Sequence, residues 1–447
     1  MTGRAGTEAG APTLPGAPTL PGPRLPIAVQ TLLFGRYRQR WLPRLRRRYG
    51  DSYLIRLAPH RRRLVVLSRL ADVRTVFAGS ASVFHAGEGN AILRPIMGKH
   101  SVLLLDEGEH LRIRQLLMPA FHGASLRGYR QLITELTRAE VAGWPTGRPV
   151  RLHQRMQALT LEIILQVVFG VTDQGRLAEL RPVVGRVVGV NPVIMLGWFY
   201  PRLRPLWPWR RFTDIRRDLD RVLYAEIAAR RQAGDLGSRP DVLSQLLRLA
   251  GPGVALTDAE LRDNLVTLLL AGHETTATAL AWAFCELARD PELLRQAQQA
   301  ADAGDENYLQ ALAKESMRLH PVLYQVARRV TEPVELGGYL VPAGTTVVPA
   351  IGLLHADPRH HDDPTRCDPG RFLGGQPAVG SWIPFGGGDR RCLGAGFALL
   401  EASVVLGEVL RRYDLSAGAS RPERAKARHI TLAPSRGARV TLSRRTG

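Results

Sequence analysis

The chain has 447 residues, of which 45% are hydrophobic and 23% are charged. This length can bury a large core, and this composition is typical of a globular protein rather than a disordered or fibrous one. Only three cysteines occur, at Cys285, Cys367 and Cys392. They are too few for a disulfide-stabilised scaffold and fit a reducing compartment, so we expect a cytoplasmic protein.

The formal net charge is +21, and most of the basic residues are arginine. Such a charge favours acidic partners, which include nucleic acid, anionic membranes and acidic redox proteins, although an arginine-rich solvated surface would give the same value. There is no zinc-finger pattern and no compact basic motif with interleaved aromatic residues, so nucleic acid is not specifically indicated. No apolar run of about 18 residues predicts a transmembrane anchor.

The first 26 residues are rich in proline and contain the hexad GAPTLP twice, at Gly10–Pro15 and Gly16–Pro21. Proline at this density favours polyproline II or disorder over a packed core. The composition does not change abruptly after this stretch. We therefore predict a flexible leader over 1–26 and one folded domain over 27–447.

Secondary structure is expected next in several segments. An amphipathic and basic stretch over about 29–49 predicts a helix, and 52–57 with 63–68 predicts a pair of strands around a polar turn. Helical periodicity also runs through 159–169. The segment 190–209 is rich in aromatic residues and proline and cannot form one regular helix.

A long apolar helix is predicted to begin after Thr257, where Thr257 and Glu260 form a capping box, and to end near 289. Its middle reads AGHETT over residues 271–276, a combination of glycine, an acid and two threonines that disfavours helix. Small residues let a planar group approach, and a hydroxyl beside a carboxylate can relay protons. The alternative is a helix bent by threonine hydroxyls that bond to the preceding turn.

Residues 385–394 read FGGGDRRCLG and place Cys392 in a glycine-rich loop just before a predicted helix. The helix N-terminus and the preceding arginines favour a thiolate at Cys392. A buried structural cysteine and a hydrolase nucleophile are the alternatives, whereas zinc needs about four ligands and no second cysteine lies nearby.

Two further pairs of residues have helical spacing. His110 and Arg114 are four residues apart and can hold an anion together, although such a pair usually lies at the surface. Glu315 and Arg318 are three residues apart, and such a pair can form an ion pair on one helical face.

The cysteine loop resembles the haem-ligand signature FxxGxRxCxG of the cytochrome P450 superfamily, with every specified position filled. Three further motifs of that family follow the family order. They are HxxxR at His110 and Arg114, [AG]Gx[DE]T[TS] at 271–276, and ExxR at Glu315 and Arg318 followed by PxRF at 369–372.

The resemblance implies a mainly α fold, a triangular prism of helices with a smaller β-rich region, over 27–447. It also implies haem b as cofactor, with Cys392 as the ligand of the iron. The residues expected around the cofactor are Phe385, Arg390, Gly394, Ala271 and Gly272, with His110, Arg114 and Arg328 at the propionates. Glu315, Arg318 and Arg371 are implied to form a structural network behind the haem.

The function implied is monooxygenation, in which one atom of O2 is inserted into a hydrophobic small molecule such as a terpene, fatty acid or polyketide. Thr275 would assist oxygen activation and Glu274 would belong to the proton supply. The reaction would be a hydroxylation or an epoxidation, in bacterial secondary metabolism. Haem-thiolate peroxygenase or isomerase activity is the alternative, and a basic nucleic-acid-binding protein is a more distant one.

Electrons must come from another protein, because the chain has no flavin or nicotinamide fingerprint. The family resemblance implies a ferredoxin with its reductase and NAD(P)H as the ultimate donor, and we expect a monomer. An acidic ferredoxin would suit the positive charge, with Arg390 or Arg391 near its docking face. The substrate-contacting residues are expected by register at Ile92, Met97, Val322 and Leu323, with Leu93, Ile96 and the 190–209 loop nearby.

Overall fold

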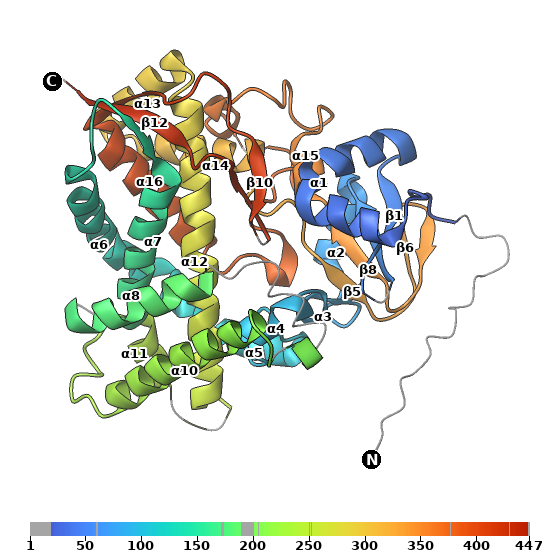
Figure 1. The fold of residues 1–447 in the computed structure, drawn as a ribbon, viewed down its shortest axis with the longest axis horizontal. Helices are drawn as coiled ribbons and strands as arrows, with labels where there is room; N and C mark the ends of the chain where they lie inside the picture. Colours follow the sequence, from blue (N-terminus) through green and yellow to red (C-terminus); the bar gives the residue numbers. More distant parts are fainter. Residues whose placement is uncertain are drawn as a thin grey trace.

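The computed structural model describes residues 19–59, 61–170, 174–188, 201–203, 205–249, 251, 253–375, 377–428 and 430–445. Helices form one large part, and a smaller part beside it contains several strands (Figure 1). The mainly α fold with a smaller β-rich region is therefore confirmed. Among the described residues, no helix is both long and apolar enough to cross a membrane.

The helices span most of the chain. They are α1 (Ile27–Tyr49), α2 (Leu70–Ala78), α3 (Ala86–Gly89), α4 (Arg94–Met97), α5 (Glu107–Leu117), α6 (Gly123–Ala142), α7 (Leu152–Phe169), α8 (Gln174–Val188), α10 (Trp209–Arg231), α11 (Val242–Leu247), α12 (Asp258–Leu287), α13 (Pro291–Ala303), α14 (Glu306–Leu319), α15 (Ile351–His355) and α16 (Ala395–Leu410).

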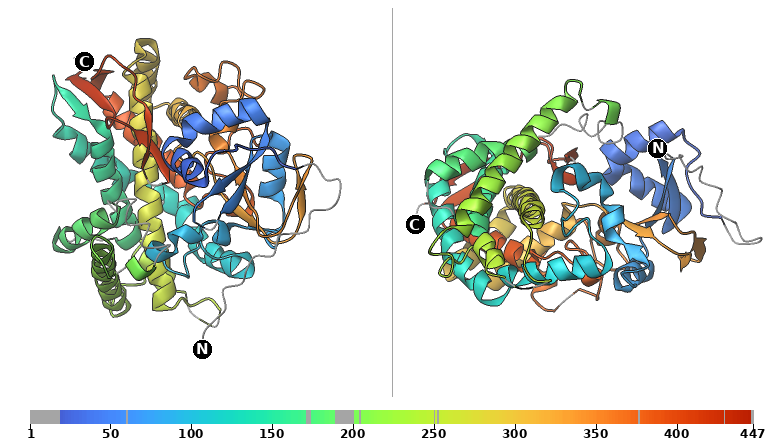
Figure 2. Two further views of the ribbon diagram at one scale, coloured as in Figure 1. Left: turned by 45° about the vertical axis from the view of Figure 1, so that its right-hand side comes forward. Right: turned by 90° about the horizontal axis from the view of Figure 1, so that it is seen from below.

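The 30-residue helix α12 runs through the helical part, and seen end-on it is surrounded by other helices (Figure 2, right). The predicted capping box starts it: the Thr257 hydroxyl accepts from the Glu260 N–H, and the Glu260 carboxylate accepts from the Thr257 N–H. The helix ends at Leu287, close to the predicted end. The helix is buried on almost every side, and its apolar residues are spread around it rather than confined to one face.

Helix α7 packs along α12 and contains the predicted helical segment 159–169. Close approach of the two helices depends on Gly272, where a Cβ atom would lie 3.0 Å from Cδ1 of Ile164. The central core lies around this pair of helices and extends to α14 and α16. These contacts fix the middle of α12 relative to the helix that follows the cysteine loop.

The predicted strand pair is confirmed as β1 (Ser52–Leu57) and β2 (Arg62–Leu67), which are antiparallel. They belong to a five-stranded sheet of order β1-β2-β8-β5-β3, with β8 (Thr346–Pro349), β5 (Arg328–Val330) and β3 (Phe84–His85). Strands β2 and β8 are parallel, with Leu64 opposite Thr346. Periodicity could not reveal this pairing, because the partners are distant in sequence.

Three smaller sheets complete the strand content. They are β4 (Pro149–Arg151) with β12 (Arg439–Arg444) and β9 (Tyr413–Ala417), β10 (Ala425–Arg428) with β11 (Thr431–Pro434), and β6 (Val334–Leu336) with β7 (Tyr339–Val341). The β10–β11 hairpin packs against α12. It therefore brings the end of the chain next to the central helix.

Part of the proline-rich stretch assigned to the leader packs against β1. The Leu54 N–H donates to the Pro21 carbonyl at 2.8 Å, and Gln30 Nε2 donates to the Leu25 carbonyl at 2.7 Å. Gly22 is required there, because a Cβ atom would lie 2.1 Å from the Leu54 carbonyl oxygen. Residues 1–18 of the predicted leader, and 189–200 with 204 of the aromatic loop, lie outside the described residues.

Candidate functional site

The cysteine loop is a tight turn that ends at α16. The Cys392 N–H donates to the Phe385 carbonyl at 2.9 Å, which closes the loop. Gly388 has φ +63°, and a Cβ atom there would lie 1.8 Å from the Phe77 carbonyl oxygen, so no side chain fits. Gly394 then occupies the N-cap position of α16. The loop therefore places the sulfur of Cys392 just before a helix N-terminus, as predicted.

The environment of the Cys392 thiol has opposing effects on its charge. Burial raises the pKa of the thiol, whereas a hydrogen bond from the Gly394 N–H and the charges of Arg114 and Arg391 lower it. The residue nevertheless keeps exposed surface. The residue thus combines exposed surface with protein packed densely around it, which leaves room for a ligand to approach.

Four basic side chains gather beside this loop from three parts of the chain. His110 and Arg114 come from α5, Arg328 from β5 and Arg390 from the loop itself; His110 is 4% exposed and Arg328 6%. Burial, followed by Arg390 and Arg114, lowers the pKa of His110 to about 4. Burial, followed by Arg390, lowers the pKa of Arg328 to about 10. Each of these pKa values is lowered by the positive charge of a neighbouring arginine, so the four side chains lie in one region.

The negative charge in this cluster is small. Arg390 Nη2 lies 2.6 Å from Oδ1 of Asp106, which also accepts a hydrogen bond from the Gly87 N–H at 2.8 Å. Within the described part of the chain, His110, Arg114 and Arg328 form no ion pair with a carboxylate. The cluster therefore has a surplus of buried positive charge, which fits the carboxylate groups of a bound cofactor.

A short stripe on α12 is accessible although the rest of its middle is buried. Leu268, Ala271, Gly272 and Thr275 follow the i, i+3, i+4, i+7 spacing of one helical face, and Ala271 is exposed. The stripe consists of apolar or small residues with one hydroxyl. Its chemistry suits contact with a flat apolar group, so it fits the predicted role of the AGHETT motif.

Both threonines of the motif bond to the preceding turn. Thr275 Oγ1 donates to the Ala271 carbonyl at 2.7 Å, and Thr276 Oγ1 donates to the Gly272 carbonyl at 3.2 Å. The hydroxyl bonds to the preceding turn, which we considered as the alternative explanation of the motif, are therefore formed. The helix nevertheless continues through the motif without interruption.

Glu274 does not lie on the accessible stripe, because consecutive helical residues point in different directions. Its carboxylate is buried against α7, where Gln157 Nε2 donates to Oε2 at 2.5 Å. Nε2 of His153 and Nε of Arg428 lie 4.0 and 3.7 Å from Oε1. Arg428 also donates from Nη1 to Oε1 of Gln157 at 3.3 Å. A polar route thus leads from the half-exposed Arg428 to the buried carboxylate.

The three residues of the predicted structural network meet in the core. Arg318 donates to Glu315 at 2.7 and 2.8 Å, and Arg371 Nε donates to the same carboxylate at 3.2 Å. The side chains of Glu315 and Arg318 are both 0% exposed. Arg318 Nη1 also donates to the His355 carbonyl at 2.9 Å. This arrangement links α14 to the segments before the cysteine loop.

The residues predicted to contact the substrate fall into two groups. Ile92 is half-buried and Met97 is 6% exposed, and both lie in the segment that contains α4. Val322 and Leu323 are half-buried, and their backbones pair with the 431–432 region of β11. Phe385 is half-buried as well.

Several polar residues of the site were not predicted. Asp106, Gln157, Arg428 and Glu401 contact the predicted residues, but they carry no local motif that would mark them. Their partners lie far away in sequence, so only the fold reveals the contacts.

Comparison with known proteins agrees with these observations. The chain matches the family model described as Cytochrome P450 over residues 18–441. It is 48% identical over 422 residues to "Putative cytochrome P450 135A1" of Mycobacterium tuberculosis, with 94% of each chain covered. It is 46% identical over 428 residues to "Putative cytochrome P450 135B1" of Mycobacterium bovis, covering 94% of this chain and 90% of that protein.

The fold is also similar to a solved structure described as retinoic acid bound cyanobacterial CYP120A1. The TM-score is 0.82 at 23% sequence identity, and the match covers 96% of this chain and 100% of that one. Cytochromes P450 bind haem b, use O2 and receive electrons from a redox partner. With the family model matched over most of its length, the chain belongs to the cytochrome P450 family and is a haem-dependent monooxygenase.

Proposed function

We propose that Cys392 is the thiolate ligand of the haem iron and that His110, Arg114, Arg328 and Arg390 bind the haem propionates. The observation that carries this proposal is the exposed residue Cys392 beside a buried surplus of positive charge. The Gly394 N–H and the charge of Arg114 both favour the thiolate. Two propionates would balance the cationic cluster. Phe385, Gly394, Ala271 and Gly272 complete the surroundings of the cofactor in this proposal.

When bound, haem b supplies the iron that activates O2. The residues of the chain have separate tasks around it. Ala271 and Gly272 leave room beside α12, and the Thr275 hydroxyl holds a proton at the accessible stripe. Glu274 supplies protons from its buried position, and Gln157 with Arg428 connects its carboxylate to the surface.

We propose an apolar small molecule of the terpene, fatty acid or polyketide class as substrate, which is hydroxylated or epoxidised in bacterial secondary metabolism. The side chains that support this choice are Leu268 on the stripe, Met97, and Ile96, which packs against Phe212 of α10. Burial of apolar surface against these side chains would supply most of the affinity. Ile92, Val322 and Leu323 are the other proposed contacts. The similar structure described as bound to retinoic acid supports an apolar ligand.

Carbon monoxide binding tests the proposed ligand. The reduced haem protein with carbon monoxide should show the strongly red-shifted Soret band of thiolate ligation, and Cys392→Ser should abolish the shift. Cys367→Ser is the matched control, because this half-buried cysteine lies outside the loop and should leave the band unchanged. A red-shifted band that survives in folded, haem-loaded Cys392→Ser would refute the assignment.

We further propose an acidic ferredoxin, with its reductase and NAD(P)H, as the electron source of a monomeric enzyme. The net charge of +21 supports an acidic partner. The two arginines before the cysteine differ in the structure: Arg390 is half-buried and paired with Asp106, whereas Arg391 is exposed. Arg391 is therefore the better docking residue.

Charge reversal tests this contact. Arg391→Glu should slow electron transfer from the ferredoxin and weaken the dependence of its rate on salt. Arg217→Glu, on the exposed surface of α10, should change neither, and equal rates in both variants would exclude the proposed contact.

A further inference from the structure

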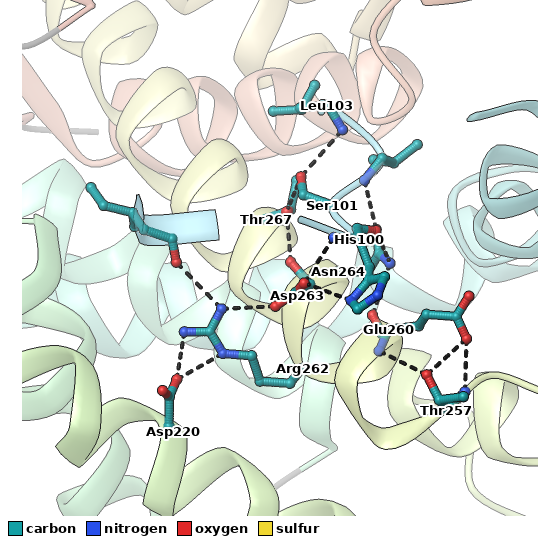
Figure 3. Close-up of polar contacts among 12 residues, drawn as sticks. His100, Ser101, Leu103, Asp220, Thr257, Glu260, Arg262, Asp263, Asn264 and Thr267 are labelled. Carbon is teal, nitrogen blue, oxygen red and sulfur yellow. Dashed lines mark hydrogen bonds and ion pairs between the residues drawn. The ribbon is translucent and has the colours of Figure 1, made fainter. Parts of the chain in front are cut away.

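The segment 98–104 is held on the first turns of α12 by a buried polar network (Figure 3). Asp263 Oδ2 accepts from the His100 N–H at 2.9 Å and lies 3.1 Å from His100 Nδ1. Gly98 approaches the other oxygen so closely that a Cβ atom would lie 1.9 Å from Oδ1, and its φ is +84°. The contact between Gly98 and the Asp263 carboxylate therefore forms in only one backbone conformation of this segment.

Asn264 and Thr267 continue the network along α12. The Val102 N–H donates to Oδ1 of Asn264 at 2.9 Å, and Nδ2 of Asn264 donates to the His100 carbonyl at 3.1 Å. Thr267 Oγ1 donates to Ser101 Oγ at 2.7 Å. Asn264 and Ser101 are both 0% exposed. Since a buried polar network is costly unless satisfied, these bonds select one register between the segment and the helix.

Arg262 links the same network to α10. This residue is 5% exposed, and its Nη1 donates to Asp263 Oδ1 at 2.9 Å and to the Ile96 carbonyl at 3.4 Å. Its Nε donates to Oδ1 of Asp220 on α10 at 2.7 Å. One guanidinium group thus joins α4, α10 and α12 (Figure 3).

These contacts lie next to the proposed ligand site. The segment 98–104 follows α4 directly, and α4 contains Ile96 and Met97. Ile96 packs against Phe212 of α10, so α10 covers α4 on the side of that residue. The accessible stripe of α12 begins at Leu268, one helical turn after Asn264 and on the same face of the helix. A shift of the network would therefore move the apolar side chains relative to the stripe.

We propose that Arg262, Asp263 and Asn264 are positioning residues that hold α4 and α10 against the start of α12. In this way they set how fast an apolar ligand enters and leaves the space beside the stripe. None of the three needs to touch the ligand. The inference rests on the proposed function in one respect, namely that the ligand is apolar and binds next to α4.

Asp220→Asn is the decisive variant, because it removes the charge that ties α10 to Arg262 and leaves Asp263 in place. The Asp220 side chain is 32% exposed, so the fold should tolerate the change. Asp214→Asn is the matched control on the same helix, since Asp214 pairs only with the neighbouring Arg217 among the described ion pairs. Asp220→Glu should restore the wild-type behaviour.

The haem-loaded protein is mixed with 4-phenylimidazole, and the Soret shift is followed in time. Association and dissociation rate constants should both rise about threefold or more in Asp220→Asn and stay at the wild-type values in Asp214→Asn and Asp220→Glu. Rate constants that are equal in Asp220→Asn and wild type would overturn the proposal, as would equal increases in Asp220→Asn and Asp214→Asn.

Hydrogen–deuterium exchange of the full chain gives a second readout that does not need a ligand. Asp263→Asn should speed exchange in residues 98–104 while the amides of α16 keep their protection. Unchanged exchange in 98–104 would also overturn the proposal. Because this comparison does not depend on the carbon monoxide spectrum, failure of the proposed haem ligation and failure of the positioning network can be told apart.

Discussion

The carboxyl group of Glu401 on α16 lies close enough to the hydroxyl of Thr276 on α12 for that hydroxyl to affect its pKa. Glu401 is 1% exposed, and within the described residues its Oε1 atom has no hydrogen-bond partner. Burial raises its pKa to about 8, although Thr276 acts in the opposite direction. Burial therefore favours the protonated form of this carboxyl group at neutral pH. It connects the helix after Cys392 to the helix that carries Thr275.

Glu401→Gln should change the pH dependence of stability. The folded pKa of about 8 exceeds the ordinary value of 4.5, so between these limits the folded chain binds a proton that the unfolded chain has released. Wild-type stability should thus fall with rising pH in this window, by up to about 1.4 kcal/mol per pH unit from this group. The variant should lack this contribution. Urea unfolding at pH 5.5 and 7.5 measures the difference, and parallel behaviour of the two proteins would contradict the assignment.

Glu315→Gln should be strongly destabilising. It leaves the fully buried Arg318 and the nearby Arg371 without a carboxylate, which typically costs about 3–5 kcal/mol. Glu292→Gln removes an exposed ion pair with Arg295 three residues along the same helix and should leave the unfolding midpoint unchanged. The midpoints in urea, with equal m-values, provide the comparison. Equal midpoints for both variants would show that the buried network contributes little.

Gln157→Leu should impair proton supply through Glu274. The variant loses the hydrogen bond of 2.5 Å to the Glu274 carboxylate and the contact with Arg428. We expect a larger share of the electrons to end as hydrogen peroxide, measured as peroxide released per NAD(P)H consumed. Gln166→Leu is the control on the same helix, because Gln166 donates to Glu162 instead. Equal peroxide yields in the two variants would argue against the route through Gln157.

Gly98→Ala and Gly108→Ala should have opposite effects on stability. At Gly98 the added Cβ atom would collide with the Asp263 carboxylate, and its φ of +84° is unfavourable for alanine, so a loss of about 1–3 kcal/mol is expected. Gly108 lies in α5 with no atom within 4 Å of the added carbon, so alanine should stabilise by about 0.5–1 kcal/mol. The midpoint of thermal unfolding should fall in Gly98→Ala and rise in Gly108→Ala. A stable Gly98→Ala variant would show that the segment can shift.

Local sequence patterns were sufficient to predict those helix ends, strands and loops that neighbouring residues determine. The capping box at Thr257 fixed the start of α12, and alternation with a polar turn indicated β1 and β2. The motif residues His110 and Cys392 likewise occupy the predicted helix and loop. These predictions held because neighbouring residues determine such features.

The partners of the site residues could not be predicted, because they depend on contacts between segments that are distant in sequence. Arg390 and Arg391 are adjacent and chemically identical, yet one is paired with Asp106 and the other is exposed. Nothing in the loop distinguishes them, since the difference comes from a carboxylate located 284 residues earlier. The partners of Glu274 and Asp263 were missed for the same reason.

The parallel pairing of β2 with β8 also affects how the protein is made. Leu64 needs Thr346 as its partner, so the edge of β2 stays uncovered until most of the chain has been synthesised. Pairing across such a sequence distance is slow, because a long loop must close before the contact forms. The small sheet is therefore completed only after the ribosome has released residues up to 349.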